Sequence, residues 1–210
     1  MNQKLLAKKN LYHEIDFSPD GKFILISIIQ KPFSYLVPYY RFPMKYAIYS
    51  SKGKELTVLH EVPLIEDLPK GFMAVRTGPR NFSWRSDRPS DLIFVEALDG
   101  GNPEKDINYR DEIFEIGYPF KQNKVSLLKT INRFYRIDWC NDTLALGYDY
   151  WWNTRNTKTY VFNPSNSNKK PKIIIDRNYQ DRYNDPGSFV KRRNFYGKSI
   201  LAVNENCLLY

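Results

Sequence analysis

The 210-residue sequence is poor in the side chains from which metal sites and disulfide frameworks are built. It has two cysteines, Cys140 and Cys207, and two histidines, His13 and His60, all far apart along the chain. Two cysteines make no disulfide framework, and none of these residues has the spacing of a zinc site. We therefore expect no metal and no other cofactor. Cys140 lies in an apolar stretch, where we expect a buried free thiol.

The motifs that present a nucleophile or hold a phosphate group are also missing. None of the ten glycines belongs to a G-x-S-x-G motif, which places the catalytic serine of α/β-hydrolases on a strained turn. Residues 197–199 come nearest and lack the second glycine. The Gly100-Gly101 pair leads into Asn102-Pro103 and not into a helix, so it predicts no phosphate-binding loop. We expect no catalytic residue in this chain and interpret His60 as a strand-edge or surface residue.

Long hydrophobic runs and dense charge clusters are lacking too. No segment approaches the ~20 apolar residues of a membrane span, and the first ten residues have no apolar core of a signal peptide. On this evidence we expect a soluble chain that is not exported. The net charge is +9, but its densest basic run is only Lys191–Arg193. A nucleic-acid interface needs a clustered basic face, so we favour an ordinary solvated surface.

What the sequence has in quantity is aromatic residues, with 16 Tyr, 13 Phe and 4 Trp. Aromatic and β-branched side chains fit a half-buried pleated surface, so this composition favours β-sheet. Thirteen prolines and ten glycines are scattered throughout the chain and leave little room for long helices.

Turn residues divide the strand-like segments into three rounds of four. Expected strands lie at residues 15–17, 23–29, 45–50 and 56–62, then 81–84, 91–98, 112–117 and 124–131, then 134–139, 144–151, 157–162 and 172–176. The aromatic positions Phe17, Trp84 and Trp139 recur at roughly 55–65 residues, longer than the ~40–45 of a minimal propeller blade because of inserted loops. We expect an all-β fold, a partial β-propeller of about three to four four-stranded antiparallel blades. These blades cover residues 15–66, 80–131 and 134–176, with an incomplete one at 195–210.

Two segments do not fit this repeat. Residues 31–43 contain three prolines and many aromatics, which forbids a regular central strand. They form either a packed surface loop or a contact surface for another domain. The chain stops inside the strand-like residues 207–210, which suggests a truncated polypeptide.

Several segments together resemble the propeller of the prolyl-oligopeptidase family of serine peptidases, and within it the glutamyl endopeptidase-like branch. They are FSPDGKF (residues 17–23), PFSYLVPYYRFP (32–43), RTGPRNFSWRSDRPSDLIFVEALDGGNPEK (76–105) and DRNYQDRYNDPGS (176–188). The resemblance implies a multi-bladed propeller that caps an α/β-hydrolase domain with a Ser-Asp-His triad and restricts access to peptides. No triad residue has a matching position here, because the hydrolase domain would follow Tyr210. Earlier blades and an export signal would precede Met1. Bacterial relatives are commonly periplasmic or secreted, so the localisation stays open.

The resemblance also suggests a role for arginines. Glutamyl specificity implies cationic groups near the acidic side chain of the substrate, and Arg76, Arg80 and Arg85 lie in the most family-like stretch. We therefore hypothesise that one or more of them bind that carboxylate. The alternative is ion pairing with Asp87, Asp91 or a neighbouring blade. Glu96 and Asp99 are candidates for an acid/base pair. A strand that is followed by a turn-forming Asp explains these two residues better.

The leading interpretation is a non-catalytic propeller fragment of such a peptidase, inactive alone, whose partners are a peptide substrate and the hydrolase domain. The alternative is a stand-alone propeller-like module that binds a protein or ligand, and a nucleic-acid binder is weaker. Three blades and part of a fourth cannot close a ring, so we expect uncovered sheet edges that promote self-association.

Overall fold

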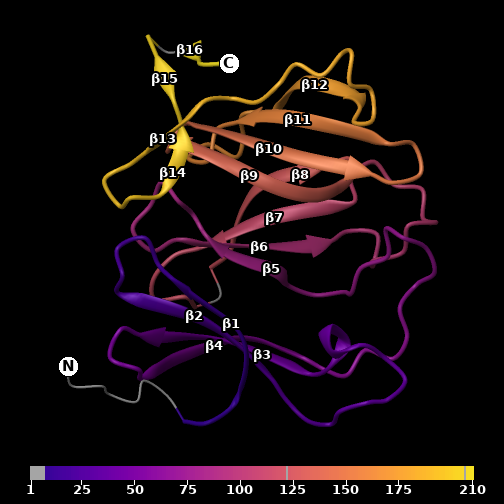
Figure 1. The fold of residues 1–210 in the computed structure, drawn as a ribbon, viewed down its shortest axis with the longest axis vertical. Helices are drawn as coiled ribbons and strands as arrows, with labels where there is room; N and C mark the ends of the chain where they lie inside the picture. Colours follow the sequence, from indigo (N-terminus) through magenta and orange to yellow (C-terminus); the bar gives the residue numbers. More distant parts are fainter. Residues whose placement is uncertain (1–7, 122, 206) are drawn as a thin grey trace.

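The computed structural model describes residues 8–121, 123–205 and 207–210. Within these residues there are sixteen β-strands and one turn of 3₁₀ helix, η1 (Tyr39–Arg41) (Figure 1). In this part of the chain no helix is long and apolar enough to cross a membrane. The described chain is therefore almost entirely β-structure, as its composition predicts.

Twelve of the strands form three antiparallel sheets of four consecutive strands, here called sheets one, two and three. Sheet one contains β1 (Leu11–Phe17), β2 (Phe23–Ile29), β3 (Met44–Ser50) and β4 (Glu55–Val62). Sheet two contains β5 (Arg80–Trp84), β6 (Leu92–Ala97), β7 (Asp111–Ile116) and β8 (Val125–Thr130). Sheet three contains β9 (Arg133–Asn141), β10 (Leu144–Trp151), β11 (Asn156–Phe162) and β12 (Lys172–Asn178). Two hairpins follow, β13 (Lys191–Arg193) with β14 (Ser199–Leu201), and β15 (Val203–Asn204) with β16 (Cys207–Leu208).

The three sheets stack one above another in chain order, from the bottom to the top of Figure 1. The β13–β14 hairpin lies beside sheet three, where Leu201 packs against Cys140 and Leu146. This is an open, partial β-propeller with three complete blades and part of a fourth, which confirms the predicted fold class. Cys140 is a buried free thiol in it, as expected, and Cys207 is exposed.

The main differences from the expected strands lie at the two ends of the chain. β1 begins at Leu11 and not at residue 15, and β13 (Lys191–Arg193) was not among the expected strands. β13 is polar, and both segments are largely exposed. They pair through backbone N–H and C=O groups, which the hydropathy of side chains does not reveal.

Sheet two is covered by apolar side chains on both faces. On β6, Phe94 points toward sheet one, whereas Ile93 and Val95 point toward sheet three, because side chains alternate along a strand. The two interfaces, here called seams, are each filled by side chains from both sheets. Leu25 and Ile48 of sheet one pack with Phe82, Trp84, Phe94 and Phe114 of sheet two. Ile93, Val95, Ile113 and Leu128 of sheet two pack with Phe134, Trp139 and Phe162 of sheet three.

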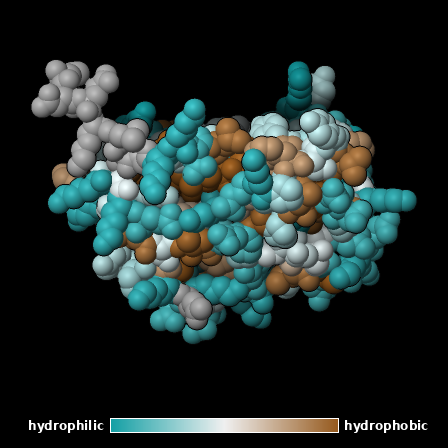
Figure 2. All heavy atoms as spheres, turned by 90° about the horizontal axis from the view of Figure 1, so that it is seen from below, coloured by the Kyte–Doolittle hydropathy of each residue, from teal (hydrophilic) through white to brown (hydrophobic). Residues whose placement is uncertain are grey.

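Sheet one has a neighbouring sheet on one face only (Figure 1). Ile15 and Phe17 pair with Ile26 and Ile24 across the other face, and both are about half exposed, at 50% and 49%. Figure 2 shows this end of the molecule, where hydrophobic surface lies between hydrophilic side chains. Self-association through such an uncovered sheet stays a prediction.

The loop at residues 31–43 leaves its apolar side chains in solvent. Tyr35 and Leu36 are 108% and 82% exposed, and Tyr39 and Tyr40 of η1 are exposed as well. Only the end of the loop packs, since Phe42 is half-buried and Pro43 is buried, and residues 35, 36, 39 and 40 face solvent. Its role as a contact surface for another domain stays a prediction.

The turns after the first strand of each blade connect neighbouring blades. The backbone N–H of Asp20 donates to Pro89 O at 3.0 Å, which joins the turns of sheets one and two. Arg88 Nε lies 2.7 Å from Asp142 Oδ1 of sheet three. Asn194, after β13, donates from Nδ2 to Ser86 O at 2.7 Å. These contacts fix the blades at the ends of their first strands.

Gly101, in the turn after β6, packs closely against the loop that precedes sheet two. Its φ is +79°, and a Cβ atom there would lie 1.9 Å from Val75 O. Gly21 has a similar φ of +70° with nothing within 4 Å of an added Cβ. We expect Gly21→Ala to cost about 1–2 kcal/mol from backbone strain. Gly101→Ala should cost about 1–3 kcal/mol more from overpacking. Urea denaturation measures both, and equal losses would contradict this account.

Candidate functional site

The three predicted arginines lie along β5, but the structure does not bring them together. Arg80 opens this strand, Arg85 directly follows it and Arg76 lies in the loop before it. Five residues of extended chain separate Arg80 from Arg85 by roughly 16 Å. Different carboxylates hold them, Asp111 at Arg80 and Asp87 with Glu115 at Arg85, so the three guanidinium groups do not form one carboxylate site.

Arg85 is held inside the seam between sheets two and three. Its side chain is 2% exposed and donates to both oxygens of Asp87, from Nε at 3.1 Å and Nη2 at 2.7 Å. Nη1 pairs with Glu115, and the guanidinium lies 4.2 Å from the centre of the Trp139 ring. Burial alone lowers the pKa of Arg85, but Asp87 and Glu115 outweigh it and raise the pKa. Two carboxylates already neutralise this cation.

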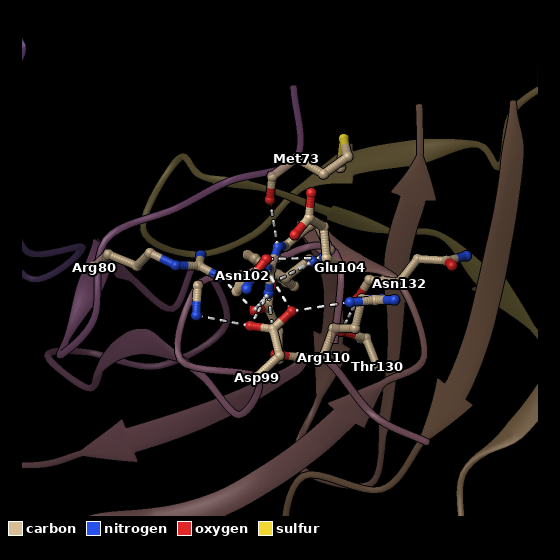
Figure 3. A network of polar contacts seen from close by, with 12 residues as sticks. Met73, Arg80, Asp99, Asn102, Glu104, Arg110, Thr130 and Asn132 are labelled. Atoms are coloured by element: carbon tan, nitrogen blue, oxygen red, sulfur yellow. Dashed lines mark hydrogen bonds and ion pairs between the residues drawn. The ribbon is translucent and has the colours of Figure 1, made fainter. Parts of the chain in front are cut away.

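Arg80 belongs to a buried ion network at the opposite end of the strand. Its Nη2 lies 2.5 Å from Asp111 Oδ1, although neither Nη2 nor Nε makes an aligned hydrogen bond within the described chain. Asp111 and Asp99 are fully buried carboxylates, at 0% and 1% exposure. Figure 3 shows Asp99 inside this network, with Arg110 beside it.

Arg133, the first residue of sheet three, connects the two carboxylates. It donates to Asp99 from Nη1 at 2.9 Å and Nη2 at 2.7 Å, and to Asp111 Oδ1 from Nη1 at 3.0 Å. Its Nε donates to Met73 O at 2.9 Å in the loop before sheet two. Arg110 adds a second cation, 3.0 Å from Asp99 Oδ2. Bidentate Arg–carboxylate pairs are strong and directional, so Arg133 fixes sheet three against sheet two and that loop.

Arg76 is the most accessible of the three predicted arginines. It is half-buried and donates to two backbone oxygens, Thr77 O at 3.1 Å and Pro79 O, with the Tyr46 hydroxyl beside it. Burial lowers its pKa. Burial, followed by the charge of Arg76, also lowers the pKa of His60 on the adjacent β4. In the described chain no carboxylate forms an ion pair with Arg76.

The remaining sequence candidates are separated from one another. Glu96 pairs with Lys124 at 2.7 Å, whereas Asp99 caps its own turn by accepting from Gly101 N at 2.8 Å and also holds Arg133. The two carboxylates thus serve different networks. Across residues 8–121, 123–205 and 207–210, no group of three or more His, Cys, Asp or Glu residues could hold a metal ion.

One histidine does lie near a serine. His13 Nδ1 is 3.3 Å from Ser27 Oγ across the β1–β2 pair. Ser27 is 1% exposed in the middle of β2, so a substrate cannot reach its hydroxyl. The contact is a cross-strand hydrogen bond, not a nucleophile with its base.

Another buried carboxylate, Asp149 on β10, was not predicted from the sequence. Its oxygens accept from Asn132 N at 2.9 Å, Lys158 N at 2.9 Å and the Tyr160 hydroxyl at 2.6 Å. Burial raises the pKa of Asp149 despite these hydrogen bonds. The network fixes the start of β9 to β10 and β11, so its role is structural.

Comparison with known proteins is informative at this point. A probable chloroplastic glutamyl endopeptidase of Oryza sativa subsp. japonica is 38% identical over 201 residues, which are 95% of this chain and 21% of that protein. A protein with the same description from Arabidopsis thaliana is 37% identical over 194 residues, or 91% of this chain and 20% of its own. The chain is related to the glutamyl endopeptidases. This confirms the resemblance to that branch, while the wider prolyl-oligopeptidase family stays a prediction.

The relationship is limited in extent. The chain spans about one fifth of the length of these relatives. No protein-family model matches it. The solved structure of the uncharacterized protein lmo1340 from Listeria monocytogenes EGD-e covers 80% of this chain and 41% of its own, with 16% identity and a TM-score of 0.46.

The Arg133 network gives a test of what holds sheets two and three together. Arg133→Met leaves Asp99 and Asp111 buried without their shared cation, which should lower the free energy of unfolding by about 3–5 kcal/mol. Lys129→Met is the control, because Lys129 is half exposed and its ion pair with Glu112 is long, at 3.8 Å. We expect this variant to lower the free energy of unfolding by less than about 1 kcal/mol. Urea denaturation of both variants measures the difference. A loss for Arg133→Met as small as that of the control would refute the bridging role.

Proposed function

We propose that this chain is a non-catalytic propeller portion of a glutamyl endopeptidase. The observation that carries the proposal is the 38% identity over 95% of the chain to a protein described as a probable glutamyl endopeptidase. The open stack of blades supports it, since each complete blade is a four-stranded unit of the kind that continues a ring. Within the longer protein, the propeller restricts entry to a Ser-Asp-His hydrolase domain, admitting peptides and excluding folded proteins.

Arg76 is our first candidate for contact with the acidic side chain of a substrate. In the described chain Arg76 donates to neutral oxygens and pairs with no carboxylate, so it can add one without losing an existing ion pair. Arg80 and Arg85 would each have to release buried carboxylates, Asp111 in one case and Asp87 with Glu115 in the other. Breaking such pairs costs several kcal/mol. Arg80 and Arg85 therefore come second in the same hypothesis.

Two proteins test the function: the 210-residue chain and the longest polypeptide that its gene encodes. We expect that polypeptide to contain an α/β-hydrolase domain and to cleave a fluorogenic peptide after Glu, whereas the 210-residue chain does not. A short Glu peptide and a folded, Glu-rich protein are compared as substrates, and only the peptide should be cleaved. A coding region with no hydrolase domain would instead support the stand-alone binding module.

Substrate selectivity tests the arginines in that longer polypeptide. Arg76→Gln should lower the ratio of kcat/KM for a Glu peptide over its Gln analogue by about tenfold or more, because an ion pair to the substrate is lost. Arg155→Gln is the control, since this arginine stacks 3.9 Å from the Trp152 ring in sheet three. Arg80→Gln and Arg85→Gln should mainly lower thermal stability. An unchanged ratio in the Arg76, Arg80 and Arg85 variants would contradict the hypothesis.

A further inference from the structure

A pocket of about 570 Å³ opens between β4 of sheet one and the adjacent face of sheet two. This volume falls within the range of small-molecule sites, about 300–1,000 Å³. Its charged lining groups are two lysines and a glutamate, whereas Arg76 lies beside it and donates to the carbonyl of the lining residue Pro79. Its walls come from both sheets and from the loop between β7 and β8: Thr57, Val58, Leu59, Pro79, Phe82, Phe94, Glu96, Ile116, Phe120, Lys121 and Lys124.

The floor of the pocket is the apolar seam between the two sheets. Phe82, Phe94, Ile116 and Phe120 are each at most 8% exposed and belong to the hydrophobic cluster of that seam. The rings of Phe82 and Phe94 lie 5.6 Å apart. Packing with neighbours thus fixes these side chains, so the floor is a preformed apolar surface.

The rim carries two lysines and one carboxylate. Lys124 Nζ lies 2.7 Å from Glu96 Oε2 and 4.0 Å from the centre of the Phe114 ring. Lys121 is exposed at the same rim and forms no ion pair with the other residues that the structure describes. One lysine is neutralised by Glu96, and the other leaves a net charge of +1 among the lining residues, at the mouth of a pocket whose floor is apolar.

We propose that this pocket binds a small amphipathic carboxylate, with its apolar body on the phenylalanine floor and its carboxylate at Lys121 and Lys124. An apolar body gains free energy in proportion to the apolar area that it buries. A carboxylate at the rim stays partly solvated and gains from the uncompensated lysine, whereas a cation would be repelled. The proposal does not depend on the peptidase function.

The charges at the rim also predict the order of affinity among ligands. A neutral molecule of the same shape can use the floor but not Lys121, so it binds more weakly than the carboxylate. Lys124 keeps its position through Glu96 and the Phe114 ring, so the cationic rim exists before a ligand arrives. Preformed groups lower the free-energy cost of ordering on binding.

The test is isothermal titration of the 210-residue chain with decanoate, decanol and N-acetyl-leucyl-leucine. Decanoate should bind, and decanol should bind at least fivefold more weakly. The Lys121→Gln/Lys124→Gln variant should weaken decanoate binding at least tenfold and leave decanol binding within twofold. The acetyl dipeptide tells whether the preferred carboxylate is an aliphatic acid or the C-terminus of a peptide.

Two further variants keep the outcome decisive. Thr57→Phe places a ring in the pocket from β4 and should weaken both decanoate and decanol. Lys129→Gln is the matched control, because Lys129 lies on β8, 3.8 Å from Glu112 of β7, and outside the pocket. Circular dichroism establishes that each variant is folded, and Lys121→Gln alone replaces the double variant if that one is not. Absence of decanoate binding up to about 1 mM, a weak affinity for any specific site, would overturn the proposal. Equal loss with Lys129→Gln would do the same.

Discussion

Sheet two can fold only if both of its faces are covered, and most of the molecule follows from this constraint. Its strands carry apolar side chains on alternate sides, Phe94 toward sheet one and Val95 toward sheet three. Neither neighbour alone removes both sets from water. Burying a large apolar side chain contributes about 1.5–3 kcal/mol, so a blade with one bare face would lose much of its stability. Stacking in chain order is the shortest way to cover both faces.

Charged residues then define how the stacked sheets are aligned. Apolar packing is non-directional, whereas the paired hydrogen bonds of Arg133 to Asp99 have fixed geometry and join sheet three to one end of sheet two. Near the other end, Asp87 and Glu115 of sheet two hold Arg85 against the Trp139 ring of sheet three. Sheet three therefore cannot slide or rotate without disturbing one of these two contacts. The arginine-rich stretch that resembles the glutamyl endopeptidases is thus largely structural, and Arg76 is its most available cation.

Local sequence signals predicted the blades well but not the contacts between them. Residues 23–29 and 92–97 are nearly continuous apolar runs between turn residues, which is the pattern of strands buried on both faces. β13 was not predicted, because Lys191, Arg192 and Arg193 have no apolar alternation. Arg133 finds Asp99 from 34 residues away, and no spacing rule connects residues so distant in sequence. The arginine cluster was visible in the sequence, but its division between the two ends of β5 was not.

The same physics distinguishes the arginines from the lysines of this chain. Arg85 and Arg133 are buried at 2% and 3% exposure, where a cation persists only with carboxylate partners, and each has two. Lys121 and Lys124 are exposed above an apolar floor, where an ammonium group keeps part of its hydration and needs no full set of partners. Fully paired charges have no capacity left for a ligand, whereas a solvated cation beside an apolar cavity retains it. The capacity of this fold to bind an anion therefore lies at the borders of its seams and not in its buried ion networks.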